Sequence, residues 1–171
     1  MELRSYVREV PDFPKKGVSY KDITPLLLDP DAMLLAVKLF MKNLPHDKID
    51  KVVGIESRGF FFATLLAEKL NAGFIPVRKP GKLPHTIHRE NYDLEYGSDS
   101  LEIHKDSINE GEKILLHDDV LATGGTAAAT CKLIEKCGGE VIQCNFLIEL
   151  ESLKGAEKLK GYNVSSLIKY S

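Results

Sequence analysis

The chain has 171 residues, of which 43% are apolar and 28% are charged, and its 23 basic and 25 acidic side chains give a formal net charge of −2. This length and balance are typical of one globular domain and exclude wholesale disorder. Without an excess of positive charge the chain lacks the broad basic surface that holds nucleic acid, so we expect no nucleic-acid partner and a local site for any anion.

The first predicted elements are a helix, a strand and a second helix. The first helix begins at Pro30 with Asp29 as its cap, and its apolar residues recur at helical spacing. Residues 51–55 (KVVGI) are a β-branched run that predicts a short buried strand. A second helix follows Gly59 and ends before Gly73.

The alternation of strand and helix continues toward the C-terminus. We predict strands over residues 74–78, 113–116 and 140–150, and a helix over residues 126–137. This order indicates an α/β fold with a Rossmann-like parallel sheet flanked by helices on both faces. Ligands of such sheets bind beyond the carboxyl ends of the strands.

Residues 79–98 differ from the rest of the chain. They are polar, contain Pro80, Gly81, Pro84 and Gly97, and show no helical period. A loop of this length inside a compact domain is usually functional, so we predict a lid that closes over a ligand.

The cysteines and the N-terminus indicate the compartment. Cys131, Cys137 and Cys144 are odd in number and fit neither a disulfide framework nor the paired spacing of structural zinc, so we expect reduced thiols. The first residues carry Glu2 and no apolar stretch of a secretory signal, and no apolar run is long enough to cross a membrane. We therefore expect a cytoplasmic protein with no membrane partner.

The most informative segment is residues 113–126, in which an apolar strand, two acids and a glycine-containing turn precede a helix. The glycines allow a sharp turn, so that backbone amides converge on one anion at the start of the helix, and the two threonine hydroxyls add hydrogen bonds. No lysine follows the glycines, which excludes the nucleoside-triphosphate loop. The predicted phosphate-binding residues are Ala122, Thr123, Gly124, Gly125 and Thr126.

The two acids, Asp118 and Asp119, would repel a phosphate unless they serve another part of the same ligand. A carboxylate accepts hydrogen bonds from the vicinal hydroxyls of a ribose. It also stabilises positive charge that develops on the ribose ring as a leaving group departs. A phosphate, a diol and a cationic sugar ring together describe a phosphoribosyl donor.

At this segment the sequence resembles the type I phosphoribosyltransferases, whose signature is an apolar strand, two acids and a turn ending in Thr-Gly-Gly-Thr. Seven further segments, in the same order, resemble the adenine-specific members of that family. They are residues 11–17, 22–27, 57–60, 77–79, 81–84, 92–97 and 147–150. The chain departs from the usual residues at four positions, namely Tyr20, Lys21, Glu56 and His117.

The resemblance implies the type I phosphoribosyltransferase fold in one domain over residues 1–171, with a hood at about residues 1–30 and a lid loop at about 79–98. It implies transfer of the 5-phosphoribosyl group from 5-phosphoribosyl 1-diphosphate to adenine, which gives AMP and diphosphate in purine salvage. It further implies Mg²⁺ held mainly by the donor, with no direct protein ligand assigned, and a homodimer.

The resemblance also assigns roles to residues. Tyr20 would stack on adenine with Leu150 on the other face of the base, while the backbone of Ser19 and Lys21 reads its edge. Glu95 would act near the purine imidazole as proton acceptor or its organiser, beside Tyr96 at the tip of the lid, and it would share the catalytic role with Asp118 and Asp119. The implied diphosphate-binding residues are Ser57, Arg58, Arg78, Lys79 and Lys82.

Two alternatives to this hypothesis fit the sequence less well. A phosphoribosyltransferase for a 6-oxopurine would need a lysine that reaches the exocyclic oxygen, and residues 144–150 contain none. A non-catalytic regulator that senses the donor would carry an additional DNA-binding segment and a basic surface. The first matched segment begins at Pro11 and the net charge is −2, so the sequence favours the enzyme.

Overall fold

A computed structural model describes residues 2–94 and 97–171, and it divides the chain into two compact units, Met1–Lys42 and Asn43–Ser171. Each unit is described by itself. Two predicted site residues, Glu95 and Tyr96, lie outside the described residues.

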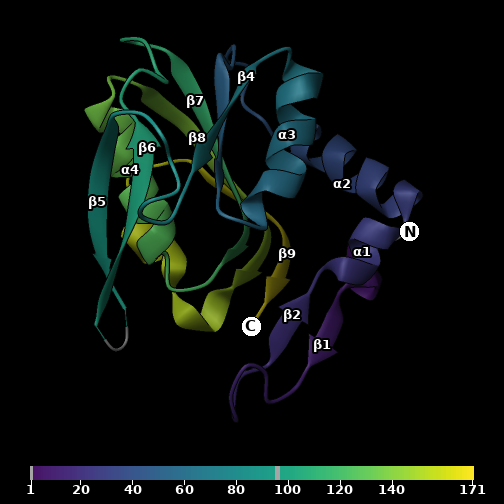
Figure 1. Ribbon diagram of the computed structural model, residues 1–171. Coiled ribbons are helices and arrows are strands. Elements are labelled where there is room, and N and C mark those ends of the chain that lie inside the picture. The colour runs from purple at the N-terminus through teal and green to yellow at the C-terminus, as the bar shows by residue number, and fades with distance from the viewer. Residues whose placement is uncertain (1, 95–96) are drawn as a thin grey trace. The chain divides into compact units, whose positions relative to one another are not determined.

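The N-terminal unit contains a small sheet and two helices (Figure 1). Its elements are η1 (Leu3–Tyr6), β1 (Arg8–Val10), β2 (Tyr20–Asp22), α1 (Thr24–Leu28) and α2 (Pro30–Lys42), with β1 and β2 antiparallel. The predicted start of α2 is confirmed, since Oδ1 of Asp29 accepts hydrogen bonds from the amides of Asp31 (3.0 Å) and Ala32 (2.9 Å). The predicted helical pattern continues to Leu44, two residues beyond the observed end of α2.

The second unit is built on a five-stranded parallel sheet. Its strands, in spatial order, are β4 (Gly73–Val77), β3 (Lys51–Ile55), β7 (Lys113–Leu121), β8 (Glu140–Leu150) and β9 (Val164–Tyr170). Helix α3 (Gly59–Leu70) and helix α4 (Gly125–Lys136) lie on opposite sides of this sheet (Figure 1). The predicted α/β fold with helices on both faces of a parallel sheet is therefore confirmed.

Several strands differ from the sequence prediction. The polar segment predicted as a loop contains β5 (Ile87–Asp93), which pairs with β6 (Ser98–His104) in an antiparallel hairpin. Apolar and polar residues do not alternate along β5, so its sequence does not mark it as a strand. Its apolar support comes from α4, against which it packs, and from the fully buried Leu101 and Ile103 of its partner β6. Strands β1, β2, β6 and β9 were also not predicted.

The length of β7 also differs from the prediction, since the strand continues past the predicted end at Leu116 to Leu121. Pairing with β8 extends the strand, since Val120 lies opposite Ile148 and Leu121 opposite Glu149. Asp118 and Asp119 therefore lie within β7, near its carboxyl end, and not in the turn that follows it.

Strand order positions the site. The chain passes from β3 through α3 to β4 on one side, and from β7 through α4 to β8 on the other, so the order reverses between β3 and β7. The carboxyl ends of adjacent parallel strands diverge at such a switch point and leave a crevice for a ligand. None of the described helices is both long and apolar enough to cross a membrane.

Candidate active site at the switch point

A cavity of about 490 Å³ lies beyond the ends of β3 and β7. Two segments that are distant in the sequence form it, namely the loop after β3 and the end of β7 with the turn that follows. Its lining residues are Glu56, Ser57, Arg58, Asp118, Asp119, Val120, Ala122 and Thr126. Six of these were predicted as ligand-binding or catalytic residues, and the structure brings them together.

An ion pair joins the two segments inside this cavity. Nε of Arg58 lies 2.7 Å from Oδ2 of the buried Asp119. Burial raises the pKa of Asp119, and the Arg58 guanidinium opposes that rise. Loss of solvation raises the pKa of Asp118 well above its usual range, with a further rise from the charge of Asp119. The two neighbouring carboxyl groups of Asp118 and Asp119 thus line the cavity beside the Arg58 guanidinium.

Gly59 explains how the loop after β3 reaches the end of β7. A Cβ atom at this position would lie 2.9 Å from Oδ1 of Asp118 and 3.1 Å from the carbonyl oxygen of His117. Only a glycine allows the first turn of α3 to approach β7 this closely. Earlier in the same loop, the peptide bond between Glu56 and Ser57 is cis.

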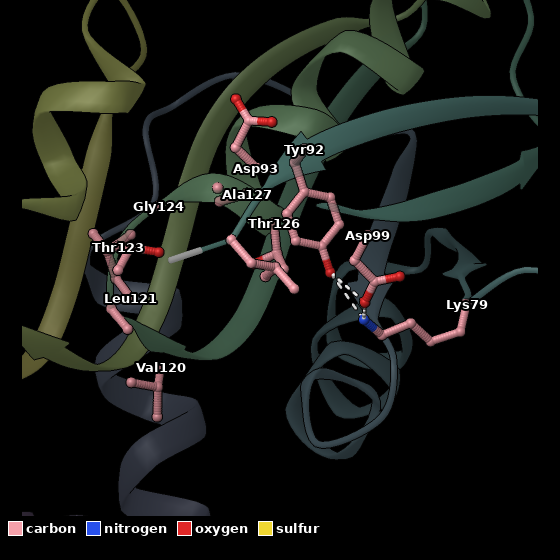
Figure 2. A pocket seen from close by; sticks show the side chains of 13 residues that line it. Lys79, Tyr92, Asp93, Asp99, Val120, Leu121, Thr123, Gly124, Thr126 and Ala127 are labelled. Atoms are coloured by element: carbon pink, nitrogen blue, oxygen red, sulfur yellow. Dashed lines mark hydrogen bonds and ion pairs between the residues drawn. The ribbon is translucent and has the colours of Figure 1, made fainter. Parts of the chain in front are cut away.

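A second cavity of about 230 Å³ adjoins the first and shares Val120, Ala122 and Thr126 with it. Figure 2 shows its side chains. One wall is the predicted phosphate loop with the first turn of α4, and the other wall comes from the β5–β6 hairpin and Lys79. All five predicted phosphate-binding residues line this cavity, and the N-terminus of α4 therefore lies at its wall.

The phosphate loop owes its shape to two glycines, one of which the sequence analysis missed. Gly124 immediately precedes α4 and has φ 80°, and an added Cβ would collide with the carbonyl oxygen of Gly155. An added Cβ on Gly155 would in turn collide with the carbonyl oxygen of Ala122. The short helix η3 (Gly155–Leu159) therefore supports the loop through backbone contact. No local signal marks this long-range contact in the sequence.

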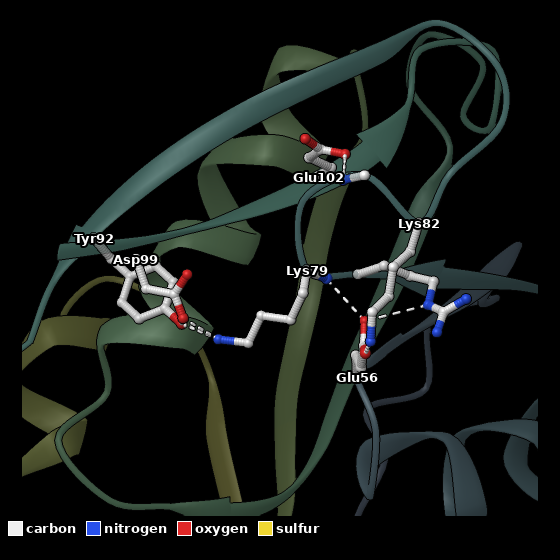
Figure 3. Close-up of polar contacts among 8 residues, drawn as sticks. Glu56, Lys79, Lys82, Tyr92, Asp99 and Glu102 are labelled. Carbon is white, nitrogen blue, oxygen red and sulfur yellow. Dashed lines mark hydrogen bonds and ion pairs between the residues drawn. The ribbon is translucent and has the colours of Figure 1, made fainter.

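Three of the five predicted diphosphate residues, Arg78, Lys79 and Lys82, contact the carboxylate of Glu56 (Figure 3). Its Oε2 accepts hydrogen bonds from Nε of Arg78 (3.2 Å) and from the amide of Lys79 (2.8 Å), while Lys82 pairs with Oε1. Burial alone would raise the pKa of Glu56, but the hydrogen bonds from these partners outweigh it and the pKa is lowered. Glu56 thus gathers positive charge beside the cavity that contains Arg58.

The side chain of Lys79 extends away from this group toward the hairpin (Figure 3). Its Nζ donates to the hydroxyl of Tyr92 at 2.8 Å and pairs with the carboxylate of Asp99. Lys79 was predicted at the diphosphate, and the structure places its side chain in the cavity of the phosphate loop.

Comparison with known proteins identifies the family. Residues 27–169 match the family described as phosphoribosyl transferase domain. An adenine phosphoribosyltransferase from Christiangramia forsetii is 86% identical over 171 residues, which cover 100% of both chains. The chain belongs to the adenine phosphoribosyltransferase family. Its type I phosphoribosyltransferase fold follows from that membership and from the parallel sheet.

Solved adenine phosphoribosyltransferases have the same fold. The structure from Thermoanaerobacter pseudethanolicus is 50% identical, with a TM-score of 0.96 over 98% of each chain. The structure from Saccharomyces cerevisiae, complexed with an imino-altritol bisphosphate and adenine, is 40% identical, with a TM-score of 0.93 over 96% of each chain.

In this adenine phosphoribosyltransferase family member, the predicted base-binding residues lie in both units. Tyr20 belongs to β2, and its ring centroid lies 5.2 Å from that of Phe13 with the planes at 72°. Nζ of Lys21 lies 2.7 Å from Glu9 and 3.2 Å from the hydroxyl of Ser19. Leu150 ends β8 in the other unit. The adenine-binding roles of Ser19, Tyr20, Lys21 and Leu150 stay predictions.

His117, an unusual residue at its position, has a structural explanation. It is fully buried in β7, and its Nδ1 lies 2.7 Å from Oδ1 of Asn145 on the neighbouring strand. Burial lowers the pKa of His117 to about 4, so the ring is neutral at physiological pH. A neutral histidine with a polar partner can thus occupy a position where an aliphatic residue is usual.

Proposed function

We propose that this chain transfers the 5-phosphoribosyl group from 5-phosphoribosyl 1-diphosphate to adenine, which gives AMP and diphosphate. The observation that carries the proposal is the junction of a phosphate loop, two acids and a basic loop at one switch point. The yeast relative, solved with adenine and a bisphosphate that carries an imino sugar, supports a base site combined with sites for two phosphate groups.

The donor would occupy both cavities. The amides of residues 122–126 would bind its 5-phosphate, and Asp118 and Asp119 would accept hydrogen bonds from the ribose hydroxyls. Ser57 and Arg58 would bind the diphosphate, together with the cations gathered by Glu56. Binding at both ends would fix C1 of the ribose between the acids and the incoming base.

The reaction replaces the bond from C1 of the ribose to the diphosphate with a bond to a nitrogen of the purine imidazole. Positive charge develops on the ring as the diphosphate leaves, and Asp118 and Asp119 stabilise it. The purine loses a proton when the new bond forms, and we assign its acceptance, or the organisation of the acceptor, to Glu95. Closure of the segment that carries Glu95 and Tyr96 would keep water from capturing the sugar cation.

We propose that Mg²⁺ enters with the donor and is held mainly by donor oxygens. Within residues 2–94 and 97–171, no group of three or more His, Cys, Asp and Glu side chains is placed to hold a metal ion. Asp119 is already engaged by Arg58, which fits a carboxylate that faces ribose and not a metal. The ion supplies neutralisation of the departing diphosphate.

Assembly and compartment complete the proposal. Phe61 on α3 is 45% exposed, and we assign this apolar surface to the contact of a homodimer. The three cysteines are free, which agrees with a cytoplasmic enzyme whose thiols stay reduced.

An assay of nucleotide formation tests the proposal. The purified protein is mixed with magnesium and 5-phosphoribosyl 1-diphosphate, and adenine, hypoxanthine, guanine and orotate are offered separately. We expect AMP from adenine alone, with kcat reduced in Asp119→Asn and Glu95→Gln. IMP or GMP would contradict the assignment of adenine, and donor binding without any nucleotide would indicate a regulator.

A further inference from the structure

Among the described residues that line the phosphate-loop cavity, Lys79 is the one basic side chain, and it is already engaged. Its Nζ pairs with Asp99 and donates to Tyr92, whose hydroxyl in turn lies 3.1 Å from Oδ2 of Asp99 (Figures 2 and 3). All three side chains line the cavity. A ligand phosphate that entered this cavity would meet both the ammonium and the carboxylate that neutralises it.

Asp99 is held in place by more than its cation. Its Oδ1 accepts a hydrogen bond from the amide of Ser100 at 2.8 Å, and it lies directly opposite Tyr92 in the pairing of β5 with β6. The Tyr92 ring lies against Gly125 in the first turn of α4, since a Cβ on Gly125 would be 3.4 Å from Cδ2 of the ring. The hairpin therefore presents a fixed negative charge at the wall of the cavity, next to the helix N-terminus.

The charges within this group favour the ion pair. The hydrogen bond from Lys79 is the main cause that lowers the pKa of Asp99. Burial would lower the pKa of Lys79, but its bonds to Asp99 and Tyr92 outweigh burial and raise it. Lys79 and Asp99 remain 38% and 33% exposed, so an incoming anion can reach the pair. A donor phosphate and the Asp99 carboxylate would compete for the same ammonium.

We propose that Asp99 is an affinity-setting residue for the phosphoribosyl donor: it pairs with Lys79 in the free enzyme and loses Lys79 to the donor's phosphate groups on binding. The inference rests on the proposed function, which supplies the donor. Because breaking the pair opposes donor binding, Asp99 weakens the affinity for the donor and speeds its release. Tyr92 remains beside Lys79 as a neutral partner in both states.

The test measures the dissociation constant of 5-phosphoribosyl 1-diphosphate with Mg²⁺ by calorimetry. Asp99→Asn keeps the size of the side chain and can still accept the Ser100 amide, but it removes the competing charge. We expect it to bind the donor about two- to fivefold more tightly than the wild type, the range of an exposed ion pair. The matched control is Glu90→Gln on the same hairpin, whose carboxylate pairs with Lys136 and Lys132 of α4 and does not line the cavity. This control should leave the affinity unchanged.

A double-mutant cycle separates the effect of the Lys79–Asp99 ion pair on donor affinity from the effect of the Asp99 charge acting on its own. Lys79→Gln should weaken donor binding, and adding Asp99→Asn to it should give no further tightening, because the cation for which Asp99 competes is gone. Unfolding temperatures of all variants verify that each is folded.

Several results would overturn the inference. Asp99→Asn could bind the donor with unchanged or weaker affinity, Glu90→Gln could tighten binding equally, or Asp99→Asn could tighten it just as much without Lys79. Each of these outcomes leaves the proposed function intact if the wild type binds the donor and forms AMP. Failure of the wild type to bind the donor would overturn both.

Discussion

Nε of Arg58 and Oδ2 of Asp119 lie 2.7 Å apart, so the loop after β3 places a cation on the last acid of β7. Burial raises the pKa of Asp119, and Arg58 opposes that rise. Arg58→Gln should therefore let the pKa rise further. The acid limb of kcat/KM for the donor, which reports ionisation of groups in the free enzyme, should move to higher pH.

Lys82→Gln is the control for this shift, since Lys82 pairs with Glu56 and not with the acids of β7. It removes the same charge from the same face but should leave the acid limb in place. An unmoved limb in Arg58→Gln would contradict the coupling of Arg58 to Asp119.

Asp118 should reduce the stability of the fold at neutral pH. Its pKa in the folded state is raised well above the usual 3.8, so folding opposes its ionisation; the cost grows as pH rises above 3.8 and is complete above the folded pKa. Asp118→Asn removes the charge and should raise Tm by about 2–4 °C for each kcal/mol recovered. The gain should vanish as pH falls toward the ordinary pKa of an aspartate. Calorimetric scans at neutral and acid pH measure it, and a Tm that falls at neutral pH would contradict the prediction.

Local chemistry explains which elements the sequence predicts well. Asp29 and Pro30 start α2, and Asn71 adopts φ 50° at the end of α3, so both helices follow from residues next to their ends. The phosphate loop and the acids before it were equally predictable, because one short segment contains them all.

The parts that the sequence does not predict depend on distant partners. The strand β5 has a polar sequence, and its apolar support comes from Leu101 and Ile103 on β6 and from α4. The salt bridge of Lys79 with Asp99 and the backbone contact at Gly155 join residues from separate elements. No spacing rule for a helix or a strand encodes such contacts.

Gly155→Ala should weaken donor binding without a change in any side chain that touches the donor. The added Cβ would collide with the carbonyl oxygen of Ala122 and displace the phosphate loop. We expect the KM for the donor to rise roughly tenfold or more, a change of about 1.4 kcal/mol, with a smaller effect on the KM for adenine. Steady-state kinetics with each substrate varied in turn measure the difference.

Gly73→Ala is the matched control for this substitution. Gly73 begins β4, and a Cβ there would meet only the flexible side chain of Lys51, with Cγ at 3.2 Å. Neither glycine has a positive φ, so the two substitutions differ in steric contact and not in backbone strain. Equal kinetic losses in both variants would contradict a specific role for Gly155.

The buried His117 should make stability sensitive to mild acid. The pKa of His117 is lowered from 6.5 to about 4, so the folded state prefers the neutral ring. The stability of the fold is therefore unaffected by this group above pH 6.5 and decreases as pH falls from 6.5 toward 4. His117→Gln removes this titration while retaining a polar side chain opposite Asn145. The difference in unfolding free energy between wild type and variant should shrink by about 2 kcal/mol between about pH 7 and pH 5. Urea unfolding at both pH values measures it, and a constant difference would show that His117 does not titrate.

Because η3 contacts the phosphate loop through backbone atoms, the Thr-Gly-Gly-Thr turn is not a self-sufficient unit. Only four residues separate Leu150, assigned to the base, from Gly155. The length of this connection therefore has to satisfy the adenine end and the phosphate end of the substrates at the same time. A designer who transplanted the turn to another parallel sheet would also have to transplant η3, because the loop would otherwise lose the backbone contact with Gly155 that supports it.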